Sequence, residues 1–274
     1  LAVIKPGYAE INFKSFETKK VSYLDFFLLK FENTITKRSR VLKRQLFATR
    51  VQYSNIGIQV DFDNTLTKGN VSELIHEKFG PFNWPEIYEN YKNKLISVEE
   101  SNIYSFEYLD ISKTDLNKFV QNNVEFREGF LEFYTYITNL GLDFKIVSSG
   151  VDFYIYSALS VLDIDIENFE IITGKSIFNN KGINVKYYDP QYNKINSNFK
   201  YSHTQYHRKM YSKIIYFGDS HTDLCSSKIC DVVFATDELQ NYYKKNKLSH
   251  FSFDNYYDVI QIFHDKNLTE PTIP

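Results

Sequence analysis

The stretch Asn55-Ile-Gly-Ile-Gln-Val60, followed at once by Asp61-Phe-Asp63-Asn-Thr65, sets the fold class. Its first six residues are short, apolar and rich in β-branched side chains, which predicts a buried strand. In open α/β sheets the reactive side chains lie at the carboxyl ends of strands, so a turn there can aim Asp61 and Asp63 into one crevice. Paired carboxylates can hold a hard cation such as Mg²⁺, and one can attack phosphorus while the other transfers protons. A turn at a strand end also favours Asp for its backbone hydrogen bonds, so this motif needs independent support.

A second acidic cluster supplies that support at the end of another predicted strand. Lys213-Ile-Ile-Tyr-Phe217 is followed by Gly218, Asp219 and Asp223, which offer further oxygen ligands if the two strands are neighbours. Between the two clusters, the strand Leu142-Asp-Phe-Lys-Ile-Val-Ser148 ends in Ser148-Ser149-Gly150 ahead of a helix. A hydroxyl and the amides of a helix N-terminus can bind a phosphate oxygen. Three strand ends therefore carry complementary phosphate chemistry.

Together these motifs resemble those of the haloacid dehalogenase-like superfamily of phosphohydrolases, over about residues 56–265. The resemblance implies that Asp61 is a nucleophile that forms an aspartyl-phosphate and that Asp63 is the acid/base. It further implies that Mg²⁺ is held by Asp61, by the backbone carbonyl of Asp63 and by Asp219, with Asp223 assisting. Ser148, with Ser149 beside it, would bind the phosphate.

The family also uses a lysine that neutralises charge on the phosphoryl group and on the aspartate. We expect Lys200 to fill this role, with Lys194 and Lys209 as alternatives, because the family places the lysine some distance before the last motif. Phe126-Arg127-Glu-Gly-Phe130 resembles the segment that returns to the core, where Arg127 would face substrate or act as a surface or structural cation. Asn70 lies where some relatives place a carboxylate that recognises a substrate amine, so its neutrality argues against phosphoserine.

The order of predicted elements indicates an α/β fold: a Rossmann-like parallel sheet covered by helices on both faces, with an inserted α-helical cap. Residues 72–123 are helical in pattern, with start signals of the capping-box type at Ser97 and Ser112. Phe169-Glu-Ile-Ile-Thr173 and Gly182-Ile-Asn-Val-Lys-Tyr187 predict a hairpin. The expected domains are an N-terminal basic extension at 1–54, a core at 55–66 and 126–268, and a helical cap at 67–125 that resembles that of the phosphoserine phosphatase-like branch.

Composition sets limits on partners and compartment. The 274 residues are 43% hydrophobic and 17% aromatic with a net charge of -2, so we expect a folded chain with no nucleic-acid partner. The most apolar early run, 21–31, is interrupted by Asp25 and Lys30, so we expect no membrane span. Cys225 and Cys230 are too few for a disulfide framework and are interpreted as small packing residues of a cytoplasmic protein. His203 and His207 have helical spacing and no third ligand in view, which favours a solvated helix face over a metal pair.

The N-terminal segment is basic and has no predicted chemistry of its own. No acidic residue occurs from Thr34 to Val60, while the segment holds Lys37, Arg38, Arg40, Lys43, Arg44 and Arg50. A solvated cationic helix or a poorly ordered extension is favoured over a phosphate contact, a membrane-surface contact or an organellar leader. The chain begins with Leu1 rather than Met, so we expect that the true start is missing or that a leader has been removed.

The sequence therefore predicts a Mg²⁺-dependent phosphatase that hydrolyses a small phosphorylated metabolite. Within the resembling branch, the run Ser148-Ser-Gly-Val-Asp152 is most similar to enzymes acting on 2-hydroxy-3-keto-5-methylthiopentenyl-1-phosphate, or on phosphocholine and phosphoethanolamine. The alternative is a catalytically silent phosphate- or partner-binding protein on the same fold, which would use the basic N-terminal segment.

Overall fold

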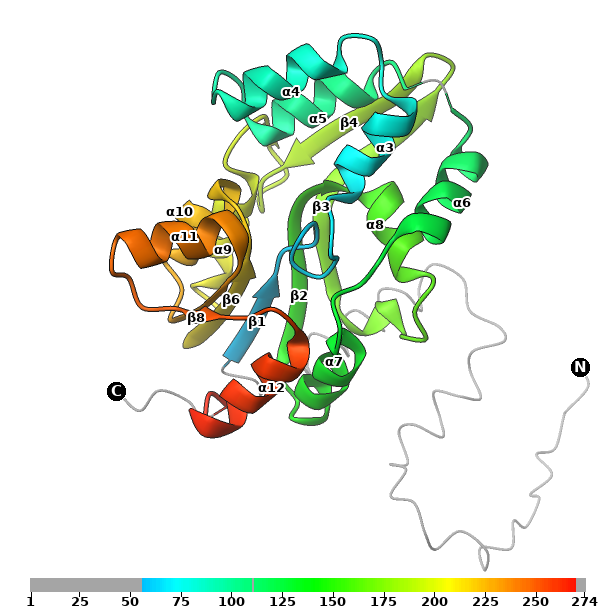
Figure 1. The fold of residues 1–274 in the computed structure, drawn as a ribbon. Helices are drawn as coiled ribbons and strands as arrows, with labels where there is room; N and C mark the ends of the chain where they lie inside the picture. The colour runs from blue at the N-terminus through cyan, green and yellow to red at the C-terminus, as the bar shows by residue number, and fades with distance from the viewer. Residues whose placement is uncertain (1–55, 110, 270–274) are drawn as a thin grey trace, which may run out of the picture. The chain divides into compact units, whose positions relative to one another are not determined.

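The computed structural model describes residues 56–109 and 111–269, so the basic N-terminal cluster lies outside the described residues. Within them an eight-stranded sheet has the order β5-β4-β3-β2-β1-β6-β7-β8 (Figure 1). Its parallel part consists of β1 (Ile56–Val60), β2 (Asp143–Val151), β3 (Glu170–Asn179), β6 (Lys213–Gly218), β7 (Val232–Ala235) and β8 (Phe251–Ser252). β1 lies between β2 and β6, so the three strand ends that carry the predicted motifs are neighbours.

The predicted α/β fold with its parallel sheet is confirmed, and one edge of the sheet carries antiparallel strands. β4 (Gly182–Tyr188) pairs antiparallel with the distal half of β3, and β5 (Lys194–Ile195) pairs antiparallel with β4. The predicted hairpin is confirmed, but β3 runs six residues beyond Thr173, because its first half completes the parallel sheet and its second half forms the hairpin. Strand β2 also runs past Ser148 to Val151, and its register with β3 shifts between Val147 and Val151.

Helices cover both faces of the sheet, as expected. Phe133 of α7 (Phe130–Asn139) contacts Phe217 of β6 and Phe263 of α12 (Tyr256–Asp265), which places these two helices on one face. Successive side chains of a strand point to opposite faces. Gln59 of β1 accordingly donates to Thr204 of α9 (Phe199–His207) on the other face, at 3.3 Å. The remaining core helices are α8 (Asp152–Leu159), α10 (Leu224–Ser227) and α11 (Asp237–Lys245).

The insert between β1 and α7 is helical, with α3 (Val71–Phe79), α4 (Trp84–Lys92), α5 (Val98–Phe106) and α6 (Lys113–Asn123). In Figure 1, α3, α4 and α5 lie beyond the carboxyl ends of the central strands. The capping box at Ser97 and Glu100 is present, while Ser112 accepts a hydrogen bond from the Asp115 amide. α5 packs on β4 and α6 packs on α8. The helical character of the insert is therefore confirmed, and its division from the core at 67 and 125 stays a prediction.

Many of the aromatic side chains of the described residues are packed in the core. Phe217 and Phe234 stack with ring centroids 4.6 Å apart, and Phe133, Tyr256 and Phe263 surround them. Two minor predictions are wrong: Cys225 is exposed rather than packed, and His207 is buried rather than solvated. No helix in the described part of the chain has both the length and the apolar character needed to cross a membrane.

Candidate active site

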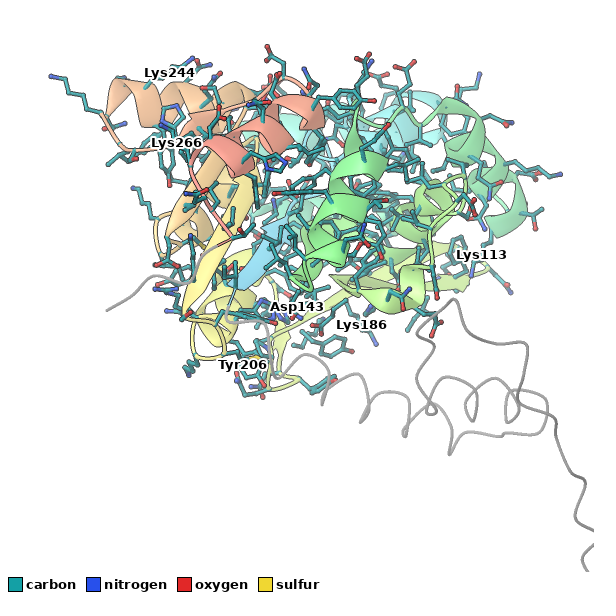
Figure 2. The ribbon with its side chains drawn as sticks, turned by 90° about the horizontal axis from the view of Figure 1, so that it is seen from below. Lys113, Asp143, Lys186, Tyr206, Lys244 and Lys266 are labelled. Atoms are coloured by element: carbon teal, nitrogen blue, oxygen red, sulfur yellow. The ribbon has the colours of Figure 1, made fainter. Side chains whose placement is uncertain are left out.

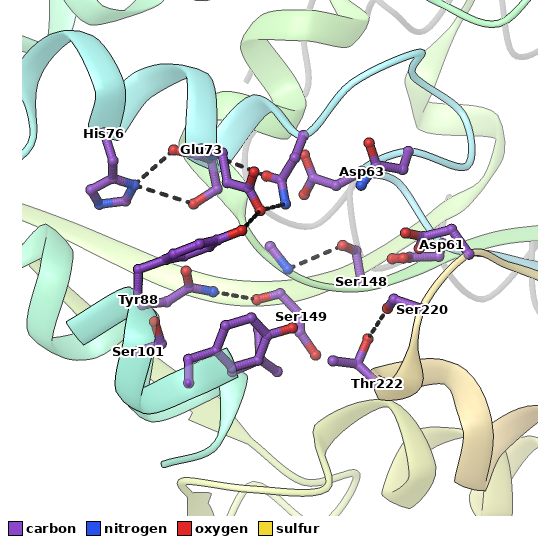
Figure 3. Close-up of a pocket in the computed structure, with 18 of the residues that line it drawn as sticks. Asp61, Asp63, Glu73, His76, Tyr88, Ser101, Ser148, Ser149, Ser220 and Thr222 are labelled. Atoms are coloured by element: carbon purple, nitrogen blue, oxygen red, sulfur yellow. Dashed lines mark hydrogen bonds between the residues drawn. The ribbon is translucent and has the colours of Figure 1, made fainter. Parts of the chain in front are cut away.

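Three neighbouring strand ends and one helix bring the predicted site residues together. Asp61 and Asp63 follow β1, Asp219 follows β6, and Asp223 lies in the short 3-10 turn His221–Asp223 after it. Ser148 and Ser149 lie in β2, beside the register shift, and such irregularities commonly re-aim side chains next to active sites. All of them except Asp223 line one cavity of about 260 Å³, shown in Figure 3.

Lys200, in the first turn of α9, is the lysine that reaches the carboxylates. Its Nζ lies 2.8 Å from Asp61 Oδ2 and 2.7 Å from Asp223 Oδ1, and it donates to Thr222 Oγ1 at 3.1 Å. Its side chain is only 3% exposed. The alternatives Lys194 and Lys209 are exposed and do not line the cavity, so the geometry favours Lys200.

The carboxylates of this site carry more negative charge than Lys200 can balance. Burial raises the pKa of Asp61, and Asp223 adds to that effect while Lys200 opposes it. Burial, followed by the charges of Asp223 and Asp61, raises the pKa of Asp219 well above its usual range. Burial alone would lower the pKa of Lys200, but Asp223 and Asp61 hold it above its ordinary value. The cluster is therefore arranged for a further positive charge.

The residues present fit a divalent cation. One carboxylate oxygen from each of Asp61, Asp219 and Asp223 lies within 4.8 Å of the others, and all three residues are buried. Asp61 Oδ1 is buried without a hydrogen-bond partner among the described residues, so it is available as a ligand. An all-oxygen donor set of this kind suits Mg²⁺.

Asp63 is held by two donors on different parts of the chain. The backbone amide of Val71, at the start of α3, donates to its Oδ1 at 2.7 Å, and the Tyr154 hydroxyl of α8 donates to its Oδ2 at 2.8 Å. Burial raises the pKa of Asp63 to about 7, with Asp61 adding to the effect and both donors opposing it. A carboxyl group that titrates near neutrality can both donate and accept a proton at physiological pH.

The two serines of β2 have different surroundings. Ser148 Oγ accepts from the Gly150 amide at 3.0 Å and lines the cavity. Ser149 Oγ points to Glu99 of α5, at 3.4 Å, and its carbonyl accepts from Asn102 and Tyr187. Ser148 is thus the better placed hydroxyl for a phosphate oxygen, while Ser149 joins β2 to the helical insert.

Of the two residues expected to contact substrate, Asn70 lines the cavity and Arg127 does not. Asn70 also caps α3, and its amide group donates to Glu73 Oε1 at 3.1 Å. The guanidinium of Arg127 donates to the carbonyls of Asn64, Thr65 and Asp254, and it lies over the Phe253 ring. Of the two roles expected for Arg127, the contacts favour the structural one, because its donors secure the loop after β1.

The insert supplies the outer wall of the cavity, and most of the residues of that wall could not be identified from the sequence pattern. Glu73 accepts a hydrogen bond from Tyr88 at 3.2 Å, and Trp84 stacks on His76 with ring centroids 5.6 Å apart. Figure 3 shows Glu73, His76 and Tyr88 on the side of the cavity opposite Ser220 and Thr222. Two buried tyrosines were also unforeseen: Tyr154 on Asp63, and Tyr216, whose hydroxyl donates to Asp223 Oδ1 at 2.6 Å.

No protein-family model matches the chain, but curated proteins and solved structures resemble it. The chain is 30% identical over 210 residues to the 2-hydroxy-3-keto-5-methylthiopentenyl-1-phosphate phosphatase of Bacillus mycoides, covering 75% of this chain and 94% of that protein. The Bacillus velezensis enzyme of the same name is 29% identical over 203 residues, covering 73% and 86%.

Among solved structures, a phospho-aspartyl intermediate analogue of phosphoserine phosphatase superposes with a TM-score of 0.56 at 16% identity, covering 75% of this chain and 97% of that one. A phosphoserine phosphohydrolase-like protein from Francisella tularensis gives 0.54 at 22% identity, covering 75% and 98%. At these identities the structural matches show a shared fold alone.

Proposed function

The chain belongs to the haloacid dehalogenase-like superfamily, in its phosphoserine phosphatase-like branch, and from this we propose that it is a Mg²⁺-dependent phosphatase acting through an aspartyl-phosphate. The observation that carries the proposal is the group of Asp61, Asp219 and Asp223 around Lys200, with Asp63 at the same cavity. Bound Mg²⁺ would supply positive charge to the phosphoryl oxygens and to the carboxylates that hold it.

In the first step, the Asp61 carboxylate attacks phosphorus. The bond from phosphorus to the leaving oxygen breaks, and the protonated Asp63 gives its proton to that oxygen. Lys200 neutralises the charge that develops between Asp61 and the phosphoryl group, and Ser148 binds a phosphoryl oxygen. In the second step, the Asp63 carboxylate takes a proton from a water molecule that attacks phosphorus. Inorganic phosphate leaves, Asp61 is regenerated and Asp63 is again protonated.

The cavity supports a small leaving group. Its volume of about 260 Å³ lies below the 300–1,000 Å³ usual for ligand pockets, so a small metabolite fits better than a large one. The relatives' substrate, 2-hydroxy-3-keto-5-methylthiopentenyl-1-phosphate, heads the candidates, followed by phosphocholine and phosphoethanolamine. Phosphoserine ranks lower, because Asn70 supplies no charge for a substrate amine.

The test is phosphate release with Mg²⁺ from those four compounds and a nucleotide monophosphate. We expect turnover of at least one, abolished in Asp61→Asn and by chelation of the metal. The matched control is Asp143→Asn, a buried aspartate outside the cavity lining, which should retain activity. If wild type and Asp61→Asn were equally inert toward the whole panel, the enzyme proposal would fall and the silent binding protein would replace it.

A further inference from the structure

Tyr154, on α8, donates a side-chain hydrogen bond to Asp63, the proposed acid/base. Its hydroxyl lies 2.8 Å from Asp63 Oδ2, the residue is fully buried, and it lines the cavity. Nothing in the two-step scheme above uses it.

The ring of Tyr154 is fixed from several sides. Phe62, the residue between the two catalytic aspartates, packs against it with ring centroids 6.3 Å apart, and Phe106 of α5 stacks on it at 6.4 Å. Phe153 meets it edge-on at 5.4 Å. Gly150 leaves room for its hydroxyl, because a Cβ at that position would lie 2.2 Å from the Tyr154 oxygen. The phenol therefore has a single position, directed at Asp63.

Two donors are enough to fix the orientation of a carboxyl group without using all its lone pairs. A carboxylate offers about four acceptor positions on its two oxygens. The Val71 amide occupies one on Oδ1 and the Tyr154 hydroxyl one on Oδ2, so rotation of the Asp63 carboxyl group is restricted from both sides. The remaining positions are available for the proton that is exchanged with the leaving oxygen.

We propose that Tyr154 is a positioning residue that aims the Asp63 carboxyl group at the leaving oxygen, an inference that rests on the proposed phosphatase function. Tyr154 keeps its own proton throughout. The proton that moves is the one on Asp63, which passes to the leaving oxygen as the bond to phosphorus breaks. Misalignment of Asp63 therefore slows the reaction in proportion to how much the leaving oxygen needs that proton.

This dependence on the leaving group separates positioning from a structural role. An alkyl alcohol leaves as a strongly basic alkoxide unless it is protonated, whereas p-nitrophenolate is a weak base and leaves without a proton. The ratio kcat/KM reports the steps up to the first departure of the leaving group, so it excludes the later hydrolysis of the aspartyl-phosphate.

The experiment compares Tyr154→Phe with wild type in Mg²⁺, using the best alkyl phosphate of the panel and p-nitrophenyl phosphate. We expect kcat/KM to fall about 10- to 100-fold for the alkyl phosphate, the size of losing a hydrogen bond to a charged group, and by less than about threefold for the aryl phosphate. The matched control is Tyr243→Phe, which removes a buried hydroxyl that donates to Ser227 at 2.9 Å outside the cavity lining. It should leave both ratios unchanged.

A second variant, Gly150→Ala, keeps the phenol but pushes its hydroxyl away, and it should reproduce the selective loss if Tyr154→Phe proves unstable. Equal losses for both substrates, or no loss for either, would overturn the positioning role while leaving the phosphatase proposal intact. A wild type that is inert toward every phosphomonoester would overturn the phosphatase proposal and this inference with it.

Discussion

Two groups of charged side chains, mostly buried, lie at opposite ends of the central sheet. At the amino end, Lys145 Nζ lies 3.0 Å from both Asp143 and Glu170, and the Tyr211 hydroxyl donates to Asp143. Figure 2, seen from below, shows Asp143 at that end of the sheet. At the carboxyl end, Asp61, Asp219 and Asp223 gather near Lys200, with Asp63 beside them.

The two groups differ in charge balance. At the amino end, Glu170 is half exposed and Lys145 holds its pKa below the ordinary value, although burial alone would raise it. Burial raises the pKa of Asp143, and Lys145 opposes that effect. At the carboxyl end, burial and mutual repulsion raise the pKa of Asp61, Asp63 and Asp219 together. The amino end thus has one buried carboxylate, Asp143, for its buried lysine, whereas the carboxyl end has three buried carboxylates around Lys200. A buried cluster left with excess negative charge is arranged for a ligand.

The sharpest test of this difference replaces each of the two lysines by methionine in a separate variant. Lys200→Met should lower turnover about 10²- to 10³-fold, the usual cost of removing one group that stabilises transition-state charge. Lys145→Met should instead lower the free energy of unfolding by about 3–5 kcal/mol, because Asp143 loses its cation in a buried position. Phosphate release and urea unfolding measure the two effects. Loss of turnover per folded molecule in Lys145→Met would break the distinction.

We expect Mg²⁺ to stabilise the protein by binding the carboxylates at the carboxyl end of the sheet and not those at the amino end. At about 100 times its dissociation constant, a ligand of the folded state raises the free energy of unfolding by about 2.7 kcal/mol. We expect this gain in wild type and in Asp143→Asn, and a smaller gain in Asp219→Asn, in thermal melts with MgCl₂ and with chelator. An equal gain in Asp219→Asn would mean that the cation binds elsewhere.

The same melts should depend on pH in a defined direction. The pKa of Asp63 rises from 3.8 to about 7 on folding, so its stabilising contribution is present below about pH 4 and is lost as pH rises through 7. Burial is the main cause of this loss and repulsion from Asp61 adds to it, and bound Mg²⁺ would relieve that repulsion. Stabilisation by Mg²⁺ should therefore be larger at pH 8 than at pH 5, and the reverse order would contradict the charge imbalance.

At the amino end the pH response has the opposite sign. Burial, followed by the charge of Lys145, lowers the pKa of His207 from 6.5 to about 3. The unfolded chain takes up a proton near pH 6.5 and the folded chain does not, so stability is lost as pH falls below 6.5. Between pH 7 and 5, wild type should lose about 2 kcal/mol more than His207→Gln, measured by urea unfolding. Parallel losses in the two proteins would show that His207 titrates normally.

The sequence predicts the carboxyl end better than the amino end, for a physical reason. Asp61, Asp63, Asp219 and Asp223 follow apolar strands directly, and the carboxyl ends of parallel strands meet at one edge of a sheet, so local pattern is sufficient. The burial of His207 depends on which face of α9 packs on the sheet, and its spacing from His203 is the same for either face.

Tyr154 and Arg127 show which contacts near the site could not be predicted from the sequence. Tyr154 lies in a helix of mainly apolar and aromatic side chains, and its packing against Phe62 and Phe106 directs its hydroxyl to Asp63. Arg127 has the position of a substrate-facing cation in the sequence, but three carbonyls of distant loops capture its donors. Both outcomes depend on contacts between residues more than 60 positions apart.

The smallest expected effect concerns the attachment of α5, in the helical insert, to the core at the carboxyl ends of the strands. Ser97 accepts a hydrogen bond from the Glu100 amide at 3.0 Å, and Ser97→Ala should lower the free energy of unfolding by about 1 kcal/mol. Turnover should hardly change, because α5 has anchors beyond its first turn: Glu99 accepts from the Phe199 amide at 3.0 Å, and Asn102 donates to the Ser149 carbonyl at 2.9 Å. Urea unfolding and phosphate release on the same sample separate the two quantities. A clear fall in the turnover of the folded protein would mean that the N-cap of α5, and not those anchors, sets the position of α5 over the cavity.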